Sequence, residues 1–198
     1  MRRGVNHSIW IVLPITLFFL SSCASPQKKQ SESRDAKFYN NRGVVLGEKG
    51  RYDQAISDFN KALEIDPMYQ KAYNNRGTTY RLMGQYDRAI FDFNKALEIN
   101  PLNPEAYNNL AWLFATAKGT GFQNGRKALE LSRKACELSE WKNPNYLDTL
   151  AAAYARLGDF ENAVMWQEKA LDSSKSARKP ELRQRLNFYR ERKPWPEG

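Results

Sequence analysis

The polar feature most suited to chemistry in this sequence is a pair of adjacent asparagines that returns at a fixed interval. The pentapeptide YNNRG begins at Tyr39 and again at Tyr73, and YNNLA begins at Tyr107, so both intervals are 34 residues (73 − 39 and 107 − 73). An asparagine amide carries two donors and an acceptor. A row of such amides can bind the main chain of an extended peptide, or it can brace neighbouring helices. The sequence leaves both roles open.

Side chains typical of catalysis are scarce. The one histidine is His7, the two cysteines are Cys23 and Cys136, and there is neither a glycine-rich phosphate loop nor a motif of paired cysteines. We interpret Cys136 as a small apolar residue of a helix. Asp58 and Asp92 occupy equivalent positions of a repeated segment, and we expect them to be solvated. The sequence therefore predicts no enzyme, no metal site and no cofactor.

Two long segments superimpose at the same 34-residue offset, which is typical of stacked structural repeats. The segments AKFYNNRGVVLGEKGRYDQAISDFNKALEIDP and QKAYNNRGTTYRLMGQYDRAIFDFNKALEINP agree at most positions. Each contains two runs of apolar and small residues at helical spacing, a glycine between the runs, and a closing proline, Pro67 or Pro101. The pattern predicts a helix, a turn and a second helix in each unit.

These residues resemble the tetratricopeptide repeat (TPR), a pattern of aromatic, small and alanine positions that ends in proline. Repeats one and two, residues 36–69 and 70–103, match it at Tyr39, Gly43, Leu46, Ala55, Phe59, Ala62 and Pro67, and at Tyr73, Gly77, Tyr80, Ala89, Phe93, Ala96 and Pro101. The resemblance implies an all-α fold. It would be a TPR solenoid, a right-handed superhelix of about four helix-turn-helix repeats with a C-terminal capping helix.

Repeats three and four, residues 104–143 and 144–172, depart from the pattern. In repeat three the insertion AKGTGFQN delays Ala128 by five residues, and we expect it to form a surface loop. Ser132 and Gln167 stand where aromatic residues are expected. The solenoid as a whole is predicted to span residues 36–172.

The basic segment 173–198 is predicted to be a capping helix and tail. Leu182, Leu186 and Tyr189 recur at i, i+4 and i+7, and this face is expected to cover repeat four. We expect the arginines between them to point to solvent. These are Arg183, Arg185, Arg190 and Arg192.

The N-terminus indicates where the protein resides. Two arginines precede an apolar run from Ile9 to Leu20, which is shorter than the about 20 residues that span a bilayer. The tetrapeptide LSSC, ending at Cys23, resembles the lipobox of bacterial lipoproteins. That resemblance implies a signal peptide at 1–22, cleavage before Cys23, and acylation of this cysteine. Residues 23–35 would then follow as the lipidated cysteine and a flexible tether.

The lipobox resemblance also sets the expected location and excludes one class of partner. It implies a lipoprotein anchored in the bacterial cell envelope, facing the periplasm from the outer membrane where the cell has one. The chain carries a net charge of +9, but nucleic acid is not expected as a partner outside the cytosol. Anionic lipid head groups or an acidic partner are the alternatives for the basic end, which by default is a solvated surface.

The candidate binding residues lie on the first helix of each repeat, which in TPR proteins lines the concave groove. The sixth-position asparagines resemble the asparagine ladder of O-GlcNAc transferase, whereas the carboxylate clamp of co-chaperones is not matched. Trp112 either anchors a ligand in the groove or packs against repeat four. The candidates are Lys37, Lys71, Asn40, Asn41, Asn74, Asn75, Asn108, Asn109 and Trp112.

Together these features predict a lipid-anchored scaffold or adaptor of the cell envelope, similar in layout to NlpI-type TPR lipoproteins. Its groove would hold an extended segment or helix of a partner protein, and no small-molecule substrate is expected. The alternative is a structural subunit of a larger envelope complex. In that case the convex face and the basic C-terminal end would be the contact surfaces, and the groove would be idle.

Overall fold

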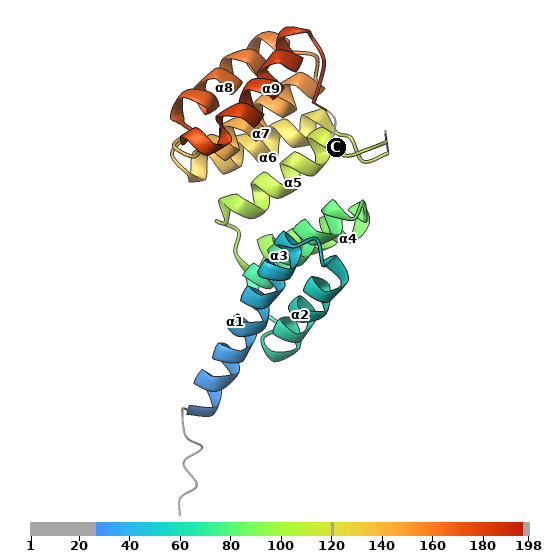
Figure 1. Ribbon diagram of the computed structural model, residues 1–198, viewed down its shortest axis with the longest axis vertical. Helices are drawn as coiled ribbons and strands as arrows, with labels where there is room; N and C mark the ends of the chain where they lie inside the picture. The colour runs from blue at the N-terminus through green and yellow to red at the C-terminus, as the bar shows by residue number, and fades with distance from the viewer. Residues whose placement is uncertain (1–26, 120, 196–198) are drawn as a thin grey trace, which may run out of the picture.

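The structure is a computed structural model that describes residues 27–119 and 121–195, and it consists of antiparallel helices stacked in sequence (Figure 1). In these residues there are nine α-helices and no strand, as the all-α prediction requires. The helices are α1 (Gln27–Glu48), α2 (Tyr52–Ile65), α3 (Gln70–Leu82), α4 (Tyr86–Ile99), α5 (Pro104–Thr116), α6 (Gly125–Leu138), α7 (Pro144–Arg156), α8 (Phe160–Ser173) and α9 (Lys179–Arg190), with the 3₁₀ turn η1 (Ser176–Arg178) before α9.

Local sequence signals set the ends of these helices. Gly50, Gly84 and Gly158 lie in the turns between the two helices of a repeat, with φ of 72°, 72° and 80°. L side chains rarely adopt this conformation, so glycine is favoured there. Asn103 and Asn143 cap α5 and α7, because their side chains accept hydrogen bonds from main-chain N–H groups of the first turn.

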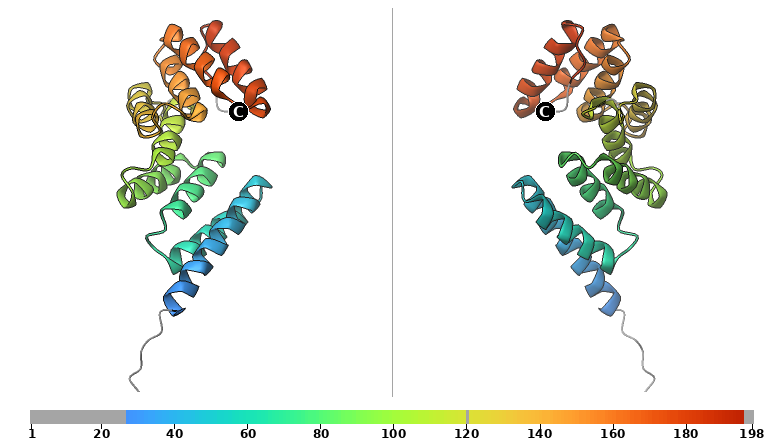
Figure 2. Two further views of the ribbon diagram at one scale, coloured as in Figure 1. Left: turned by 90° about the vertical axis from the view of Figure 1, so that its left-hand side faces the viewer. Right: turned by 90° about the vertical axis from the view of Figure 1, so that its right-hand side faces the viewer.

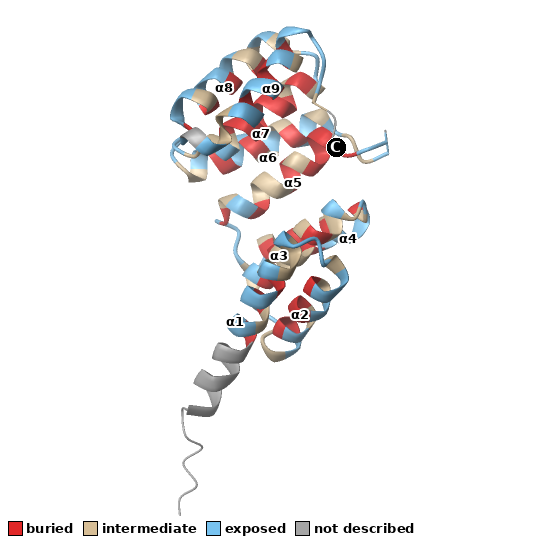
Figure 3. Ribbon diagram, viewed as in Figure 1, coloured by how far each residue is buried: buried red, intermediate tan, exposed pale blue. Residues whose placement is uncertain are grey.

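Small residues let the two helices of each repeat approach closely. A Cβ atom built on Gly43 would lie 2.6 Å from the Phe59 ring, and one on Gly77 would lie 2.8 Å from the Phe93 ring. The alanines at the predicted repeat positions are fully buried, as the red segments of Figure 3 illustrate. This close approach forms the core that runs between the helices of each pair.

The odd-numbered helices line the inner side of the stack. In the described chain α1 contacts α3, α3 contacts α5 and α5 contacts α7, whereas successive even-numbered helices make at most marginal contact. Elements on the inside of a curved stack lie closer together than those on the outside. The side views in Figure 2 show the resulting curvature. One face of each of α1, α3, α5 and α7 therefore lines the concave side.

The insertion in repeat three is more closely packed than a plain surface loop. Its first residue, Ala117, is buried, and the Phe122 ring packs edge-on against Tyr86 with centroids 5.1 Å apart. The main-chain N–H of Lys118 donates to the Tyr86 hydroxyl at 3.1 Å. The insertion thus ties repeat three back to α4 of repeat two.

The first helix begins earlier than the predicted solenoid boundary at residue 36. Residues 27–35 were predicted to be a flexible tether, but the structure has them as the first turns of α1. No glycine or proline interrupts this segment, and its lysines, glutamines and glutamate favour helix, so the helix of repeat one extends backwards. Among the described helices, none has both the length and the apolar character to cross a membrane.

The capping helix packs as predicted. Leu182, Leu186 and Tyr189 of α9 are buried, and α9 contacts α8. Pro180, in its first turn, corresponds to Pro104 and Pro144 at the starts of repeats three and four. Helix α9 therefore occupies the place of the first helix of a fifth repeat.

Candidate functional site

The asparagine pairs form hydrogen bonds from one repeat to the next. Asn75 Nδ2 donates to Asn40 Oδ1 at 2.9 Å, and Asn109 Nδ2 donates to Asn74 Oδ1 at 3.1 Å and to the Thr78 hydroxyl at 3.4 Å. In each rung the sixth residue of a repeat donates to the fifth residue of the preceding repeat. We call this series the amide ladder. Its geometry is that of the bracing role, because each acceptor asparagine, Asn40 or Asn74, is buried.

The same two positions connect the capping helix to repeat four. Counting from Pro144 and Pro180, the fifth residue of repeat four is Asp148 and the sixth residue of α9 is Arg185. Arg185 Nε and Nη2 each donate to the Asp148 carboxylate at 2.9 Å. The last rung of the ladder is thus a bidentate ion pair.

The Asp148–Arg185 pair is almost completely enclosed. Both side chains are 3 to 4% exposed, and Gln167 Nε2 adds a hydrogen bond of 2.9 Å to Asp148 Oδ1. Burial raises the pKa of the Asp148 carboxyl, and the opposing influences are the charge of Arg185 and the bond from Gln167. The prediction that Arg185 points to solvent was wrong. Its helical spacing places it beside the covering face, and Asp148 supplies the charge that makes its burial tolerable.

The ladder is interrupted between repeats three and four. By position, Thr149 should donate to Asn108 Oδ1, but the Thr149 hydroxyl donates instead to the main-chain oxygen of Asn145 at 3.1 Å. Within the described chain the Asn108 Oδ1 is buried without a hydrogen-bond partner. One rung of four is therefore missing.

Two further ion pairs were not expected. Asp58 and Asp92 were predicted to be solvated, but they are 3% and 1% exposed. Arg42 and Arg76, one in each repeat, bind them through two hydrogen bonds of 2.6 to 2.8 Å. Burial raises the pKa of the Asp92 carboxyl, against the bonds and charge of Arg76. These pairs join the two helices of a repeat, so the solvated interpretation was wrong.

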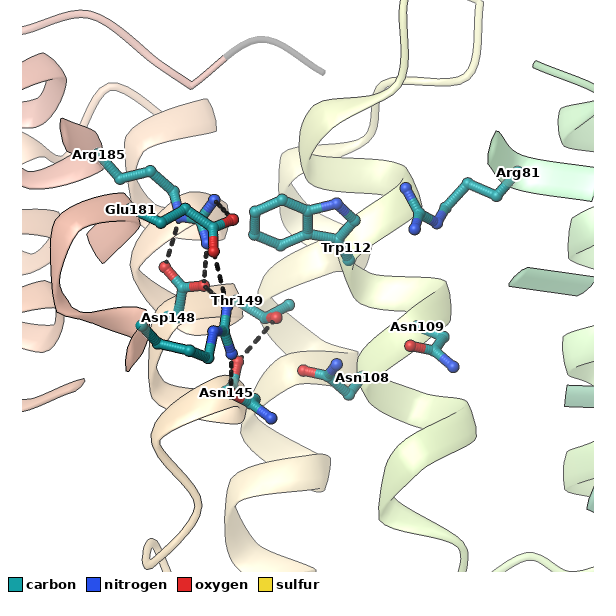
Figure 4. A pocket seen from close by; sticks show the side chains of 10 residues that line it. Arg81, Asn108, Asn109, Trp112, Asn145, Asp148, Thr149, Glu181 and Arg185 are labelled. Carbon is teal, nitrogen blue, oxygen red and sulfur yellow. Dashed lines mark hydrogen bonds and ion pairs between the residues drawn. The ribbon is translucent and has the colours of Figure 1, made fainter. Parts of the chain in front are cut away.

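A polar cavity of about 300 Å³ opens on the concave side at the interrupted rung (Figure 4). It is bordered by α3, α5, α7 and the segment from η1 to α9. Trp112 forms one wall, and the Arg185 guanidinium lies 5.0 Å from its ring centroid. Charged groups dominate the remaining lining, which includes Arg81, Arg178, Arg185, Asp148 and Glu181. These charged groups surround the Asn108 Oδ1, which has no hydrogen-bond partner in the described residues.

A second, smaller cavity of about 190 Å³ lies further along the same side, between α1 and α3. Val44, Gly47 and Leu82 give it an apolar lining, and the Leu82 side chain is half exposed. The concave side therefore presents an apolar cavity near repeat one and a charged cavity near repeat four.

The remaining predicted site residues are placed as follows. Lys37 and Lys71 are exposed on α1 and α3. Asn41 is exposed and accepts a bond from Asn40 Nδ2 at 3.4 Å. Trp112 is half-buried, so it both lines the cavity and packs against the core. Cys23 lies outside the described residues, and the binding role of the asparagines stays a prediction.

The thiol of the described residues, that of Cys136, is not reactive at neutral pH. Cys136 is buried, and burial raises the pKa of its thiol to about 12, so the thiolate is absent at neutral pH. Within residues 27–119 and 121–195, no three histidine, cysteine or carboxylate side chains lie together as metal ligands would. What the site offers is hydrogen bonding and charge.

Sequence reasoning missed the charged half of the site. A signal was present, because the fifth position changes from Asn in repeats one to three to Asp148 in repeat four, and the sixth changes to Thr149. Aligning Pro180 with Pro144 would have placed Arg185 at the next sixth position. The hydroxyl of Thr149 turning to its own helix is a feature that only the structure shows.

These observations define a class, a helical repeat solenoid with an open concave face. Comparison with family models gives the family. Models described as tetratricopeptide repeat match residues 36–69 and 71–103, residues 93–131, and residues 145–181. Because these ranges together cover more than half of the chain, the protein belongs to the tetratricopeptide repeat family. Such repeats generally mediate protein–protein binding, and no enzyme family is indicated.

Known structures share the fold at low sequence identity. A structure titled as a functional characterization of pilF from Pseudomonas aeruginosa is 20% identical, with a TM-score of 0.67, 82% of this chain covered and 71% of that one. MamA from Desulfovibrio magneticus is 18% identical, with a TM-score of 0.60 and coverages of 80% and 85%. An uncharacterized protein of Methanocaldococcus jannaschii is 41% identical over 39 residues, which are 20% of this chain and 45% of that protein.

Proposed function

We propose that this protein is a lipid-anchored scaffold of the bacterial cell envelope, which holds a segment of a partner protein in its concave groove. The observation that carries the proposal is the pair of unlike cavities on one face, one apolar and one charged. An extended segment that spans both would be recognised by an apolar side chain and by polar groups together. The lipobox-like LSSC at Cys23 supports the anchor.

The alternative, a structural subunit of an envelope complex, is favoured by a different surface. Trp141 and Met165 remain more than a third exposed, and the Trp141 ring stacks on Trp166 with centroids 5.2 Å apart. Met165 belongs to the even-numbered α8, away from the concave side. Exposed aromatic and apolar side chains such as these are typical of protein contact surfaces.

Site-specific photocrosslinking separates the two proposals. A photoreactive residue at Leu82 would report on the groove, and one at Met165 would report on the outer face; both side chains are exposed. We expect a discrete crosslinked product from position 82 in cells that express the full chain. Products from position 165 alone would favour the alternative.

The anchor is tested separately. Replacing Cys23 with Ala should abolish labelling by an alkyne-bearing fatty acid and move the protein from the membrane to the soluble fraction. A Cys136→Ala variant is the matched control, because Cys136 is buried and should not carry lipid. Membrane association of the Cys23 variant at the wild-type level would refute the lipoprotein proposal.

A further inference from the structure

The sixth and ninth residues of the first helices lie on the concave side. In repeat two they are Asn75 and Thr78, which line the apolar cavity, and in repeat three they are Asn109 and Trp112, which line the charged one. Residues three apart share one face of a helix. Because α9 occupies the place of a first helix, its sixth and ninth residues belong to the same concave row.

On α9 these residues are Arg185 and Phe188, counted from Pro180, and both contact Trp195 of the segment that follows the helix. The Trp195 ring meets the Phe188 ring edge-on, with centroids 4.9 Å apart, and the Arg185 guanidinium lies 5.4 Å from the Trp195 ring centroid. The same guanidinium lies 5.0 Å from the Trp112 ring centroid (Figure 4). The chain thus places one of its own indoles on the groove positions of α9.

The turn that leads to Trp195 is the one used inside the repeats, with one change. The N–H of Arg192 donates to the carbonyl of Tyr189 at 3.0 Å, and the N–H of Lys193 donates to that of Phe188 at 2.9 Å. The same two bonds close the turns after α1, α3 and α7, where the residue of positive φ is glycine. Arg192 has a φ of 56°, which an L residue adopts at a cost, and contacts such as those of Trp195 offset it.

Beyond this turn the chain does not enter a second helix within the described residues. Trp195 stands between Pro194 and Pro196. A proline disfavours the helical conformation of the residue before it, so Pro196 disfavours helix at Trp195. Prolines also restrict the free chain, which lowers the entropy cost of docking. The sequence therefore favours an extended segment with one aromatic side chain, and we call residues 192–195 the C-terminal strap.

The contacts of the strap indicate what kind of group the site accepts. The charge of Arg185 is already balanced, because its guanidinium donates to Asp148 and Glu181 at 2.8 to 2.9 Å. These bonds use the edge of the planar group, and its flat face remains for an aromatic ring. The Phe188 ring adds an edge-to-face contact. The site therefore suits an uncharged aromatic side chain, and tryptophan best of all.

We propose that Arg185 and Phe188 form an indole site, which Trp195 occupies from within the chain and which an aromatic residue of a partner segment takes when the strap leaves. The strap is then an internal competitor of the partner. This inference rests on the proposed groove function and names an aromatic residue beside proline as what the groove recognises at its repeat-four end.

The test empties the site and refills it with a free peptide. The full chain in detergent, isotope-labelled at tryptophan and phenylalanine, is compared with its Trp195→Ala variant by NMR. The probe is acetyl-Lys-Pro-Trp-Pro-Glu-Gly, the sequence of residues 193–198. We expect the variant to bind the peptide, with shifts of the Trp112 indole and Phe188 ring signals. Wild type should bind at least about ten-fold more weakly, because its own strap is present at a millimolar effective concentration.

Matched controls make the result specific. Trp141→Ala removes another partly exposed indole, which stacks on Trp166, and this variant should bind the peptide as weakly as wild type does. The peptide with Ala in place of Trp should not bind to Trp195→Ala. Adding Phe188→Ala to Trp195→Ala should weaken binding about two- to ten-fold. Trp195→Leu keeps apolar bulk against the core and provides a second emptied site.

No binding by Trp195→Ala and Trp195→Leu, equal binding by wild type, or equal binding of the Ala peptide would overturn the inference. A thermal melt of each variant confirms that it is folded. The Leu82 crosslink tests the groove function independently. A product from position 82 together with no peptide binding by Trp195→Ala would refute the indole site and leave the proposed function standing.

Discussion

The ion pair between Asp148 and Arg185 should be the most costly single interaction to break in the capping region. In an Arg185→Met variant the apolar stem is retained against Trp112, but the buried Asp148 carboxylate loses its bidentate partner and keeps only the Gln167 amide at 2.9 Å and the more distant Arg178 guanidinium at 3.7 Å. Breaking a buried pair by removing one partner typically costs about 3 to 5 kcal/mol. We therefore expect a large loss of stability from a substitution that preserves most of the packing.

The carboxyl group limits this cost by taking up a proton. The ordinary pKa of aspartic acid is near 3.9, about three pH units below pH 7, and each unit corresponds to about 1.4 kcal/mol. Protonating the carboxyl group at pH 7 therefore costs about 4 kcal/mol, and the loss of stability in the variant cannot exceed this value. For a domain of 150 to 250 residues this corresponds to a fall in Tm of roughly 6 to 16 °C. Replacing both partners, as in Asp148→Leu with Arg185→Met, should restore most of the lost stability.

The pH dependence gives a second readout of the same variant. A carboxyl group whose pKa is raised in the folded state contributes stability that is fully present below its unfolded pKa and is lost as the pH rises through its folded pKa. The deficit of Arg185→Met relative to wild type should therefore shrink as the pH is lowered from 7 towards 4. Thermal melts followed by circular dichroism at several pH values measure it.

The matched control is a surface ion pair that another arginine of α9 makes with α8. Arg190 and Glu168 lie 2.8 Å apart, but both side chains are about half exposed. Arg190→Met should therefore change stability by less than about 1 kcal/mol. Equal effects of Arg185→Met and Arg190→Met, or a deficit that does not depend on pH, would refute the reasoning that burial of the Asp148 charge sets the cost.

Three further predictions concern the repeats. Gly43→Ala should destabilise by about 1 to 3 kcal/mol, because its Cβ would meet the Phe59 ring at 2.6 Å; Gly47→Ala, whose Cβ has 3.9 Å of room, should instead stabilise by about 0.5 to 1 kcal/mol in denaturant titrations. Asn109→Ala should cost about 1 to 3 kcal/mol by leaving a buried acceptor unpaired, and an unchanged or raised Tm would contradict the bracing role. Cys136 should resist alkylation at pH 9 until the protein unfolds, because its raised pKa of about 12 keeps the thiol of the folded protein protonated. The buried neutral thiol contributes stability that is lost as the pH rises towards 12.

The repeat architecture could be predicted because the signals that define it are local and repeated. Gly43 and Gly77 have the same neighbours in two nearly identical segments, and the alanines recur where helices must approach. Helical spacing likewise located the buried face of α9, at Leu182, Leu186 and Tyr189. Periodicity records which side of a helix is apolar, and that is enough to place the core.

The charged contacts could not be predicted in this way, because periodicity does not record which charges meet. Asp58, Asp92 and Arg185 each look like solvent-facing residues when they are judged by type alone. Each is buried because a partner of opposite charge is supplied by another helix, 16 residues away in the two repeats and 37 residues away at the cap. The helical pattern therefore determines which face of a helix is apolar, whereas ion pairs between helices determine which charged side chains are buried.

The two roles that the sequence left open for the asparagines need not exclude one another. An amide ladder braces the stack wherever the sixth residue of a repeat carries an amide that reaches the fifth residue of the repeat before it, as Asn75 and Asn109 do. The same geometry predicts a free acceptor wherever that residue is shorter or turns to its own helix, as Thr149 does. On this argument, the residue type at the sixth position of each repeat determines which amides of the concave face are paired across the repeats and which are left unpaired.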